Sequence, residues 1–207
     1  MALGNNTFVD EYRGTDDLYI AEILSDNNEE NGGYTTGPVY KLAPVAEISK
    51  TTETSSNTKF YDNAPAFTIN AEGADTLTLG VPAVSLANLA AINGKDYDET
   101  TGAFLDGEGK PKYFALGYRL GLTDGTYRFV WRYKGTFAVP DEASETKNNS
   151  ADSQGQTLTY TSINTQHVFT KTGKTGKALV VDERDGKADL TNFFKSVTTC
   201  DTLQAKA

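Results

Sequence analysis

The sequence predicts a mainly β protein in which antiparallel sheets pack as a sandwich or a partly closed barrel, with a short flanking helix and a short C-terminal helix. Three observations support this prediction. The 207 residues include 11 tyrosines and 10 phenylalanines together with many threonines, residue types that favour strands. Several segments alternate apolar and polar residues, which is the pattern of a half-buried strand. Helical patterns are few and short. We expect one domain that spans residues 1–207.

The first 81 residues contain four strand-like segments separated by polar loops. These segments are residues 17–24, 39–53, 57–62 and 74–81. In the last of them leucine and threonine alternate, which predicts one buried face and one polar face. We also expect a polar N-terminal arm over residues 1–15 and a long acidic loop over residues 25–37.

A short helix is predicted directly after these strands. Ser85 is a favourable N-cap, because its hydroxyl can accept a hydrogen bond from a backbone N–H of the first turn. Gly94 supplies the left-handed residue that commonly ends a helix. The predicted inner face consists of Leu86, Leu89, Ala90 and Asn93. A second long loop, over residues 96–111, is expected to follow.

The clearest signal is a long β-hairpin over residues 112–137. Asp124 and Gly125 predict a type I′ turn at its centre. On the return strand aromatic and basic residues alternate, which predicts an aromatic core face and a basic outer face. The aromatic residues are Tyr127, Phe129, Trp131 and Tyr133, and the basic residues are Arg128, Arg132 and Lys134.

The C-terminal third is predicted to contain a third long loop, a strand, a basic turn and a helix. The strand covers residues 156–170, and its threonines at positions 157, 159 and 161 lie opposite Leu158 and Tyr160. The helix covers residues 189–199, because its apolar residues follow i, i+3, i+4, i+7 spacing. These apolar residues are Leu190, Phe193, Phe194 and Val197.

The turn over residues 171–177 contains Gly-Lys-Thr, the end of a phosphate-binding loop. The first glycine of that motif would have to stand at position 168, which is Val168, and a strand-like run rather than a helix follows the turn. We therefore interpret the segment as a turn between two strands.

Other catalytic and metal-binding signatures are also incomplete. His167 is the only histidine and Cys200 the only cysteine, so neither a catalytic triad nor a zinc site can be assembled around them. A calcium-loop pattern that starts at Asp96 has Thr101 where glycine is required and Gly107 where glutamate is required. We predict no enzymatic activity, no metal and no cofactor.

The net charge of −9 is unevenly distributed along the chain. Residues 1–104 contain 16 acidic and five basic residues, whereas residues 105–207 contain 12 acidic and 14 basic residues. Such asymmetry fits a subunit in which one surface attracts the opposite surface of the next copy. The acidic balance disfavours ordinary nucleic-acid binding. No apolar stretch approaches the ~20 residues of a membrane helix, and the N-terminus lacks a signal-peptide pattern, so we expect no membrane partner.

Six segments between residues 38 and 163 resemble, in order, the major tail (tail tube) proteins of long-tailed phages of Gram-positive bacteria. The segments are "PVAEISKTTET", "KFYDNAP", "ADTLTLGVPAVSLANLAAING", "KPKYFALGYRL", "FVWRYKGTFAVPDEASETK" and "QTLTYTS". No single segment is specific, but their order is. The acidic loop over residues 25–37 and the chain after residue 165 match this family less well.

The resemblance implies a fold of two packed antiparallel sheets with a flanking helix, related to type VI secretion tube proteins. It also implies hexameric rings that stack head to tail into a tube. Expected partners are further copies of the chain, a tape-measure protein and tail-end proteins, while DNA passes through without specific binding. The expected location is the tail of the virion, and the host cytoplasm during assembly.

Within such a tube, a channel for DNA should be lined by neutral or acidic side chains, because lysines would hold phosphates and slow passage. The predicted channel-lining residues are Glu47, Ser49, Thr51, Glu53, Thr76, Thr78, Thr157, Thr159 and Thr161. Contacts between subunits are predicted for charged residues of both signs. They are Asp26, Glu29, Glu30, Arg119, Arg128, Arg132, Lys134, Lys171, Lys174 and Lys177.

Two alternatives of other classes stay open at this point. The first is a monomeric β-sandwich binding module that recognises carbohydrate or another surface through loops 96–111 and 140–155. The second is a small hydrolase that uses loop carboxylates, since 28 acidic residues offer many candidate pairs.

Overall fold

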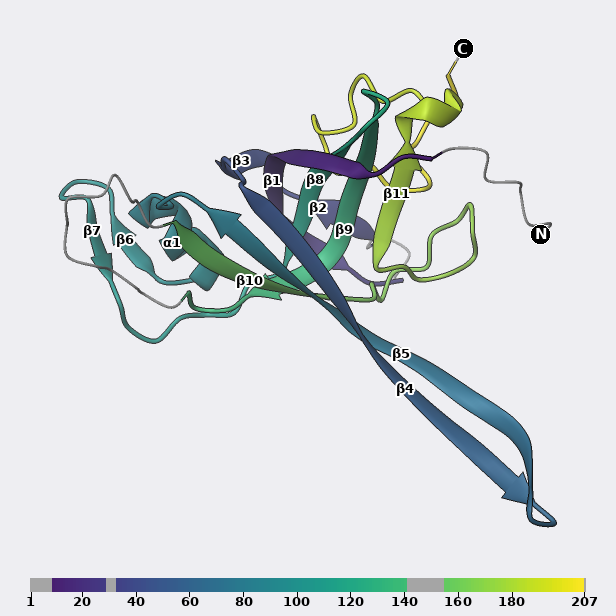
Figure 1. The fold of residues 1–207 in the computed structure, drawn as a ribbon. Coiled ribbons are helices and arrows are strands. Elements are labelled where there is room, and N and C mark those ends of the chain that lie inside the picture. The colour runs from purple at the N-terminus through teal and green to yellow at the C-terminus, as the bar shows by residue number, and fades with distance from the viewer. Residues whose placement is uncertain (1–8, 29–32, 141–154, 207) are drawn as a thin grey trace, which may run out of the picture.

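The computed structural model describes residues 9–28, 33–140 and 155–206. The fold is mainly β, as predicted, and consists of a nine-stranded antiparallel sheet, a two-stranded sheet and one short α-helix (Figure 1). Its elements are β1 (Tyr12–Asp26), β2 (Tyr34–Thr36), β3 (Tyr40–Ala43), β4 (Glu47–Tyr61), β5 (Ala64–Val81), α1 (Leu86–Asn93), β6 (Asp96–Asp98), β7 (Ala103–Leu105), β8 (Phe114–Leu122), β9 (Tyr127–Phe137), β10 (Gln156–Ile163), β11 (Ala178–Asp182) and the 3₁₀ turn η1 (Glu183–Asp185).

The large sheet has the strand order β2-β1-β8-β9-β10-β5-β4, with β11 also paired to β9 and β3 also paired to β1. A first core is built from both halves of this order, so the sheet bends around it. Leu77, Leu79 and Tyr160 come from β5 and β10, and Leu18 and Leu116 come from β1 and β8; all are buried. Leu77 and Leu79 are buried while Thr76 and Thr78 are exposed, which confirms the predicted alternation.

A second core lies on the opposite face of β9 and is mostly aromatic. Trp131 and Tyr133 pack there with Phe169 and Phe193, and the Trp131 indole donates a hydrogen bond of 2.8 Å to the Phe193 carbonyl oxygen. Most rings in this core meet edge to face or tilted, for example Tyr133 and Phe169 at 4.8 Å between centroids, whereas Phe129 and Phe194 are stacked. Trp131 is fully buried, which confirms that its role is packing.

The predicted basic face of the return strand is wrong, because β9 contains a β-bulge. Leu116 pairs with Arg132 and Phe114 pairs with Gly135, so two residues of β9 stand opposite the single residue Ala115 of β8. The extra residue reverses the alternation beyond it. Arg132 therefore faces the first core, while Lys134, two residues later, lies on the side of the second core.

The longest element pair is the β4–β5 hairpin, whose outer part projects far from the body of the molecule (Figure 1). We call residues 53–72 the arm. Among the described residues, β10 pairs with β5 only from Asp75 to Val81, so the arm has no strand neighbour outside the hairpin. The arm ends in a two-residue turn in which Asp62 and Asn63 have φ of 50° and 61°. Positive φ at both central positions is the conformation of a type I′ turn.

The helix α1 confirms the predicted caps. The Ser85 hydroxyl accepts a hydrogen bond from the Asn88 N–H, and Gly94 has φ of 62°. The predicted inner face is only partly correct, because the structure buries Ala90 and Ile92 and leaves Leu86 half exposed.

Two predicted loops and the predicted N-terminal arm are shorter than expected. The loop over residues 96–111 contains the β6–β7 hairpin, in which the Asp98 carboxylate accepts hydrogen bonds from the Thr100 N–H and the Thr101 hydroxyl. β1 includes residues 12–15 of the predicted N-terminal arm (residues 1–15) and extends to Asp26. β2 occupies residues 34–36 of the predicted acidic loop. Residues 1–8, 29–32 and 141–154 lie outside the described part of the chain.

The Asp124–Gly125 turn is not type I′, because only Gly125 has positive φ. The hydrogen bond from the Leu122 N–H to the Thr126 carbonyl oxygen closes a three-residue loop instead. Glycine in the left-handed conformation at the third position is typical of such loops.

The predicted C-terminal helix over residues 189–199 is wrong. Residues 191–197 form consecutive turns, with i→i+3 hydrogen bonds from the Phe193 N–H to Leu190 and from the Lys195 N–H to Asn192. The Phe193 carbonyl oxygen, which an α-helix would offer to the Val197 N–H, accepts from the Trp131 indole and the Thr198 hydroxyl. Tertiary hydrogen bonds thus replace the helical ones, although Phe193 and Val197 are buried as their spacing predicted.

Candidate functional site

The nine predicted channel-lining residues lie together on one face of β4, β5 and β10. We call this the polar face. Cross-strand pairing places them in rows: Ser49–Thr78–Thr159, Thr51–Thr76–Thr161 and Glu47–Gly80–Thr157. Glu53 is the next residue on this side of β4, and its side chain lies beside Gly73 of β5. The strands expose this face because the alternate residues of β5 and β10 fill the first core.

The polar face is neutral to acidic. Seven of its nine residues are exposed, and Thr159 and Thr161 are half-buried. Glu47 and Glu53 are its only charged members, and none of the nine is a lysine or an arginine. The face therefore offers hydroxyl and carboxylate groups to whatever lies against it, with no cation to hold a phosphate.

The four predicted basic contact residues of the β8–β9 hairpin are each paired with a carboxylate of the same chain. Arg128 makes two hydrogen bonds to Asp182, of 2.5 Å from Nε and 2.8 Å from Nη2. Arg119 Nε lies 2.5 Å from Asp16 and 2.8 Å from Asp17. These ion pairs link β8 to β1 and β9 to β11. Both arginines therefore stabilise the fold of the single chain.

Arg132 belongs to a buried ionic cluster at the root of the arm. Its Nη1 donates a hydrogen bond of 2.5 Å to Asp75, which is 2% exposed. Lys177 Nζ lies 3.1 Å from the other oxygen of Asp75, and Lys50 Nζ lies 3.8 Å from Asp75. Burial raises the pKa of Asp75, but hydrogen bonds from Lys177 and Thr52 and the charges of Arg132 and Lys50 outweigh it and hold the pKa below its ordinary value.

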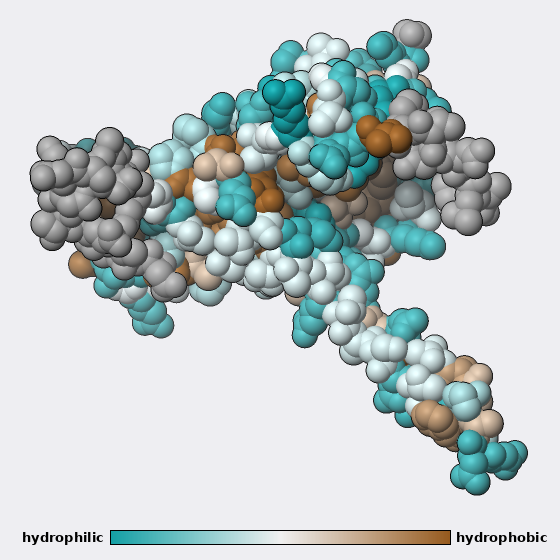
Figure 2. Space-filling model, viewed as in Figure 1, coloured by the Kyte–Doolittle hydropathy of each residue, from teal (hydrophilic) through white to brown (hydrophobic). Residues whose placement is uncertain are grey.

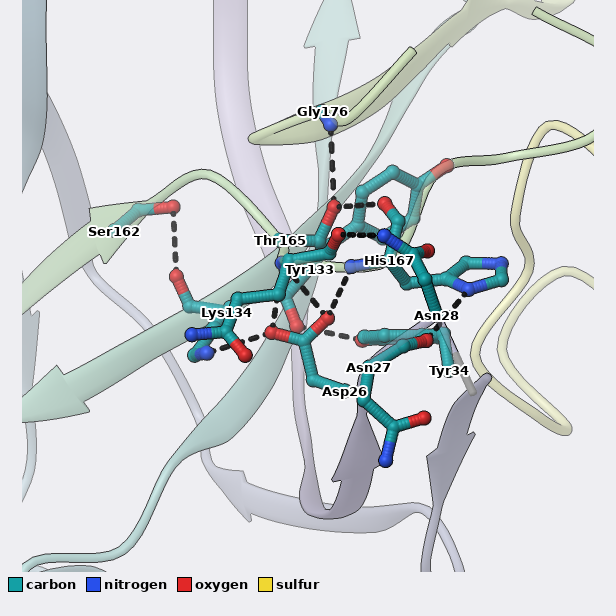
Figure 3. A network of polar contacts seen from close by, with 11 residues as sticks. Asp26, Asn27, Asn28, Tyr34, Tyr133, Lys134, Ser162, Thr165, His167 and Gly176 are labelled. Atoms are coloured by element: carbon teal, nitrogen blue, oxygen red, sulfur yellow. Dashed lines mark hydrogen bonds and ion pairs between the residues drawn. The ribbon is translucent and has the colours of Figure 1, made fainter. Parts of the chain in front are cut away.

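Lys134 and Asp26 lie at the centre of a second network, which Figure 3 shows. The Asp26 carboxylate accepts hydrogen bonds from Lys134 Nζ at 2.6 Å and from the backbone N–H groups of Gln166 and His167 at 2.9 Å. Next to it, the Asn28 side-chain oxygen accepts a hydrogen bond from the Val168 N–H. This network fastens the end of β1 to the chain that follows β10.

The same network explains why β10 ends earlier than predicted. Residues 166–168 donate their N–H groups to the side chains of Asp26 and Asn28, so these groups are not available to a sheet partner. β10 therefore stops at Ile163, and His167 lies in a bend rather than on a strand. The His167 ring contacts the Asn27 carbonyl oxygen through Nδ1 at 3.1 Å and packs edge to face on Phe169.

In both networks the carboxylates are held by donors of the same chain. The Asp26 carboxylate is saturated by donors, and its pKa is lowered because the hydrogen bonds from Lys134, Gln166 and His167 outweigh the effect of burial. Burial raises the pKa of the half-buried Cys200 thiol, which disfavours the reactive thiolate. Within the described residues, no group of three or more histidine, cysteine, aspartate and glutamate side chains is placed to hold a metal ion.

The three lysines of the 171–177 turn have different environments. Lys177 is bound within the chain by Glu72 at 2.7 Å, by the Gly73 carbonyl oxygen at 2.9 Å and by Asp75. Lys171 and Lys174 are exposed. Of the acidic residues predicted to meet this turn in a neighbour, Asp26 is engaged with Lys134, and Glu29 and Glu30 lie outside the described residues.

An apolar arm tip is the main surface feature that sequence reasoning missed. Phe60, Tyr61, Phe67 and Ile69 are 64%, 62%, 51% and 52% exposed. The pairing of Lys59 with Phe67 and of Tyr61 with Ala64 puts Tyr61, Phe67 and Ile69 on one side, where the rings of Tyr61 and Phe67 stack at 6.2 Å. Figure 2 shows these hydrophobic atoms near the far end of an otherwise pale and teal arm.

The chain matches no protein-family model, and a search of curated proteins finds no match to it. None of the helices in the described part of the chain combines the length and the apolar character that a membrane span requires. The function is therefore argued from the surfaces described above.

Proposed function

We propose that this protein is a structural subunit of a phage tail tube. Copies of the chain associate into hexameric rings, the rings stack head to tail, and DNA passes through the channel during ejection into the host. In this proposal the two halves of the large sheet, bent around the first core, correspond to the two packed sheets of the tail-tube fold. The protein acts in the virion tail, with a tape-measure protein filling the channel beforehand and tail-end proteins closing the tube.

The observation that carries the proposal is the polar face. Nine residues chosen for an uncharged or acidic channel lie in adjacent rows on three neighbouring strands, uncovered and without a lysine or arginine among them. A face of this kind repels or ignores phosphates, so DNA in contact with it is not retained by counterion release. An ordinary nucleic-acid-binding surface has the opposite charge.

Two further features support self-assembly. The arm carries exposed aromatic side chains away from the body, and large exposed apolar groups on a soluble protein mark a surface that is covered by a partner. The charge asymmetry between the two halves of the sequence favours a heterologous contact, which generates rings or filaments rather than a closed dimer.

Electron microscopy of the purified protein over a range of concentrations tests the proposal. We expect rings with six-fold symmetry and tubes built from them. A protein that sedimented as a monomer at all concentrations and formed neither would contradict the proposal and favour the monomeric binding module.

Size-selective labelling tests which residues line the channel. In a Cys200→Ser background, Thr78→Cys in assembled tubes should react with a small maleimide but not with a maleimide carrying a large polymer. The matched control is Ser196→Cys, an exposed residue outside the polar face, which should react with both reagents. Equal reaction of Thr78→Cys with the large reagent in tubes would place the polar face outside the channel.

A further inference from the structure

The apolar arm tip is not covered by any other element in the described part of the chain. Its far end lies away from every other described element (Figure 1). Between residues 54 and 71 the only charged residues are Lys59 and Asp62, so the tip is a neutral aromatic knob with one carboxylate at its apex. Hydration of its exposed rings is unfavourable, and a concave apolar surface elsewhere would relieve this.

Such a surface exists at the opposite end of the same hairpin. A groove of about 600 Å³ opens where the start of β4 approaches β8, β9 and β11. We call it the root groove. Its apolar part includes Ile48, Leu120, Val130 and Val180, of which Val180 is 51% exposed.

The charged side chains of the root groove are mainly cations, and each is already paired with a carboxylate: Arg128 with Asp182, and Arg132 and Lys50 with Asp75. Lys50, Arg128 and Arg132 line it together with Glu47. Lys50 and Arg132 share the single carboxylate of Asp75 with Lys177, and the Nε of Arg132 is buried without a hydrogen-bond partner. An aromatic ring placed beside these cations gains a cation–π interaction, as Arg128 already does with Tyr12 at 5.4 Å.

We propose that the arm tip of one copy docks into the root groove of the next copy. The aromatic side chains contact the apolar floor and the cations, and the Asp62 carboxylate at the apex lies near Lys50. The contact is heterologous, since tip and groove are different surfaces, so it propagates from copy to copy. This inference rests on the proposed function, for which it names the surfaces that join one subunit to another.

The length of the arm sets a limit on the spacing of the copies. Tyr61 follows Ile48 by 13 residues in one strand. At about 3.3 Å per residue, the tip lies roughly 43 Å from the groove of its own chain. Two copies joined in this way are therefore displaced along the arm by at most about that distance.

A lipid surface is the other class of partner that an aromatic tip could enter. Attraction to anionic lipids requires a cluster of lysines and arginines beside the apolar residues. Lys59 is the only base between residues 54 and 71, so the sequence around the tip does not supply such a cluster. The groove, in contrast, matches the tip in polarity, and its exposed Lys50 offers one cation to the Asp62 carboxylate.

Disulfide trapping tests the contact directly. In a Cys200→Ser background, Tyr61→Cys and Val180→Cys are mixed as two separate single variants and oxidised under assembly conditions. We expect a covalent dimer as the main product. Ser55→Cys, on the shaft of the arm, replaces Tyr61→Cys in the matched control and should give at least a tenfold lower yield. Equal yields from the two arm positions would overturn the proposed docking.

Assembly of tip variants supplies the second measurement. Tyr61→Ser/Phe67→Ser/Ile69→Ser and, on the groove side, Val180→Glu should each lose most tube formation while far-ultraviolet circular dichroism shows a folded monomer. Ser55→Ala/Ala71→Ser, a cross-strand pair of exposed positions nearer the base of the arm, should assemble like the wild type. Normal tubes from the triple variant would refute the docking and leave the tube function standing. A distance between successive rings well above the length of the arm in wild-type tubes would do the same.

Failure of the proposed function has a different signature, since the wild-type protein itself would then form no rings or tubes. Flotation of the wild type with vesicles of phosphatidylcholine and phosphatidylglycerol, lost in the triple variant, would assign the tip to a lipid partner instead and overturn the inference.

Discussion

Asp75 is the residue on which the root of the arm depends. It is almost fully buried and faces three cations, Lys50, Arg132 and Lys177, from three different elements. Buried ions are costly in isolation, so removal of the one shared carboxylate leaves Arg132, which is only 8% exposed, without its ion-pair partner. Its burial and its three cationic partners both indicate that Asp75 stabilises the fold.

Asp75→Asn should therefore lower the free energy of unfolding by about 3 to 5 kcal/mol, the cost of breaking a buried ion pair from one side. Urea denaturation monitored by Trp131 fluorescence measures this change. Asp62→Asn is the matched control, because Asp62 lies in the exposed turn of the arm and asparagine tolerates positive φ. A loss below 1 kcal/mol for Asp75→Asn would show that the cluster contributes little.

The pH dependence of stability follows from the same carboxylate. The folded pKa of Asp75 lies below its ordinary value of 3.8. The unfolded chain therefore takes up the proton first, and the stability that ionised Asp75 contributes is present above pH 3.8 and is lost as the pH falls through the folded pKa. Asp26 and Asp182 have lowered pKa values as well and act in the same direction.

We expect the free energy of unfolding of the wild type to change little between neutral pH and about pH 5 and to fall steeply below pH 4. The difference between wild type and Asp75→Asn should shrink over the same acidic range, because the wild-type carboxylate becomes protonated. A difference that stayed constant down to the acid unfolding transition would contradict the assignment of the shift to Asp75.

At the scale of elements, the arm is held to the body by Lys177 as well as by strand pairing. Its ammonium group bridges Glu72, the Gly73 carbonyl oxygen and Asp75 on β5, although it belongs to the turn before β11. The contact lies where β10 stops pairing with β5 and the hairpin leaves the sheet. Lys177 thus helps to fix the base of the arm, next to the contact between Arg132 and Asp75.

Lys177→Met removes these charge-assisted hydrogen bonds while keeping the aliphatic side chain. Hydrogen exchange of backbone amides in residues 50–56 and 70–75 should become about tenfold faster, which corresponds to a loss of roughly 1.4 kcal/mol against local opening. Lys174→Met, an exposed lysine of the same turn, should leave the exchange rates unchanged. Equal effects of the two variants would assign the anchoring of the arm to strand pairing alone.

Elements with a strong local pattern could be predicted from the sequence, and elements fixed by distant contacts could not. The alternation in "ADTLTLGV" and "QTLTYTS" located β5, β10 and the polar face, and Ser85 and Gly94 located α1. Residues 64–73 form a strand without any buried face, so they show no alternation to detect. The turns at residues 191–197 depend on a hydrogen bond from Trp131, which lies 62 positions away from its acceptor.

The predicted contact residues illustrate the same limit for charges. Sequence spacing placed Arg119, Arg128, Arg132 and Lys134 on one face of the β8–β9 hairpin, but it could not show that Asp16, Asp182, Asp75 and Asp26 each reach one of them. A signal was present in hindsight only for the arm tip, where "KFYDNAPAFTI" combines a turn dipeptide with aromatic residues on both sides.

At the scale of the whole molecule, internal pairing reduces the number of charges that remain for assembly. Lys177 and the four basic residues of the β8–β9 hairpin are paired with carboxylates of the same chain, whereas Lys171 and Lys174 are exposed, with Lys171 Nζ 3.4 Å from the Leu203 carbonyl oxygen. In the head-to-tail arrangement the acidic half of a neighbouring chain is the complementary surface. These two lysines are therefore the members of the turn that we assign to the contact between subunits.

Lys171→Glu/Lys174→Glu should weaken tube formation and leave the monomer folded. Surface ion pairs contribute about 0.2 to 1 kcal/mol each, so the loss of two pairs per subunit should raise the concentration needed for assembly by roughly two- to thirtyfold. Sedimentation of tubes at a series of protein concentrations measures this shift. Because exposed charges are screened, added salt should narrow the difference from wild type. The charge-matched control is Lys187→Glu/Lys195→Glu, outside the turn; if it weakened assembly equally, net charge rather than this turn would set the strength of the contact.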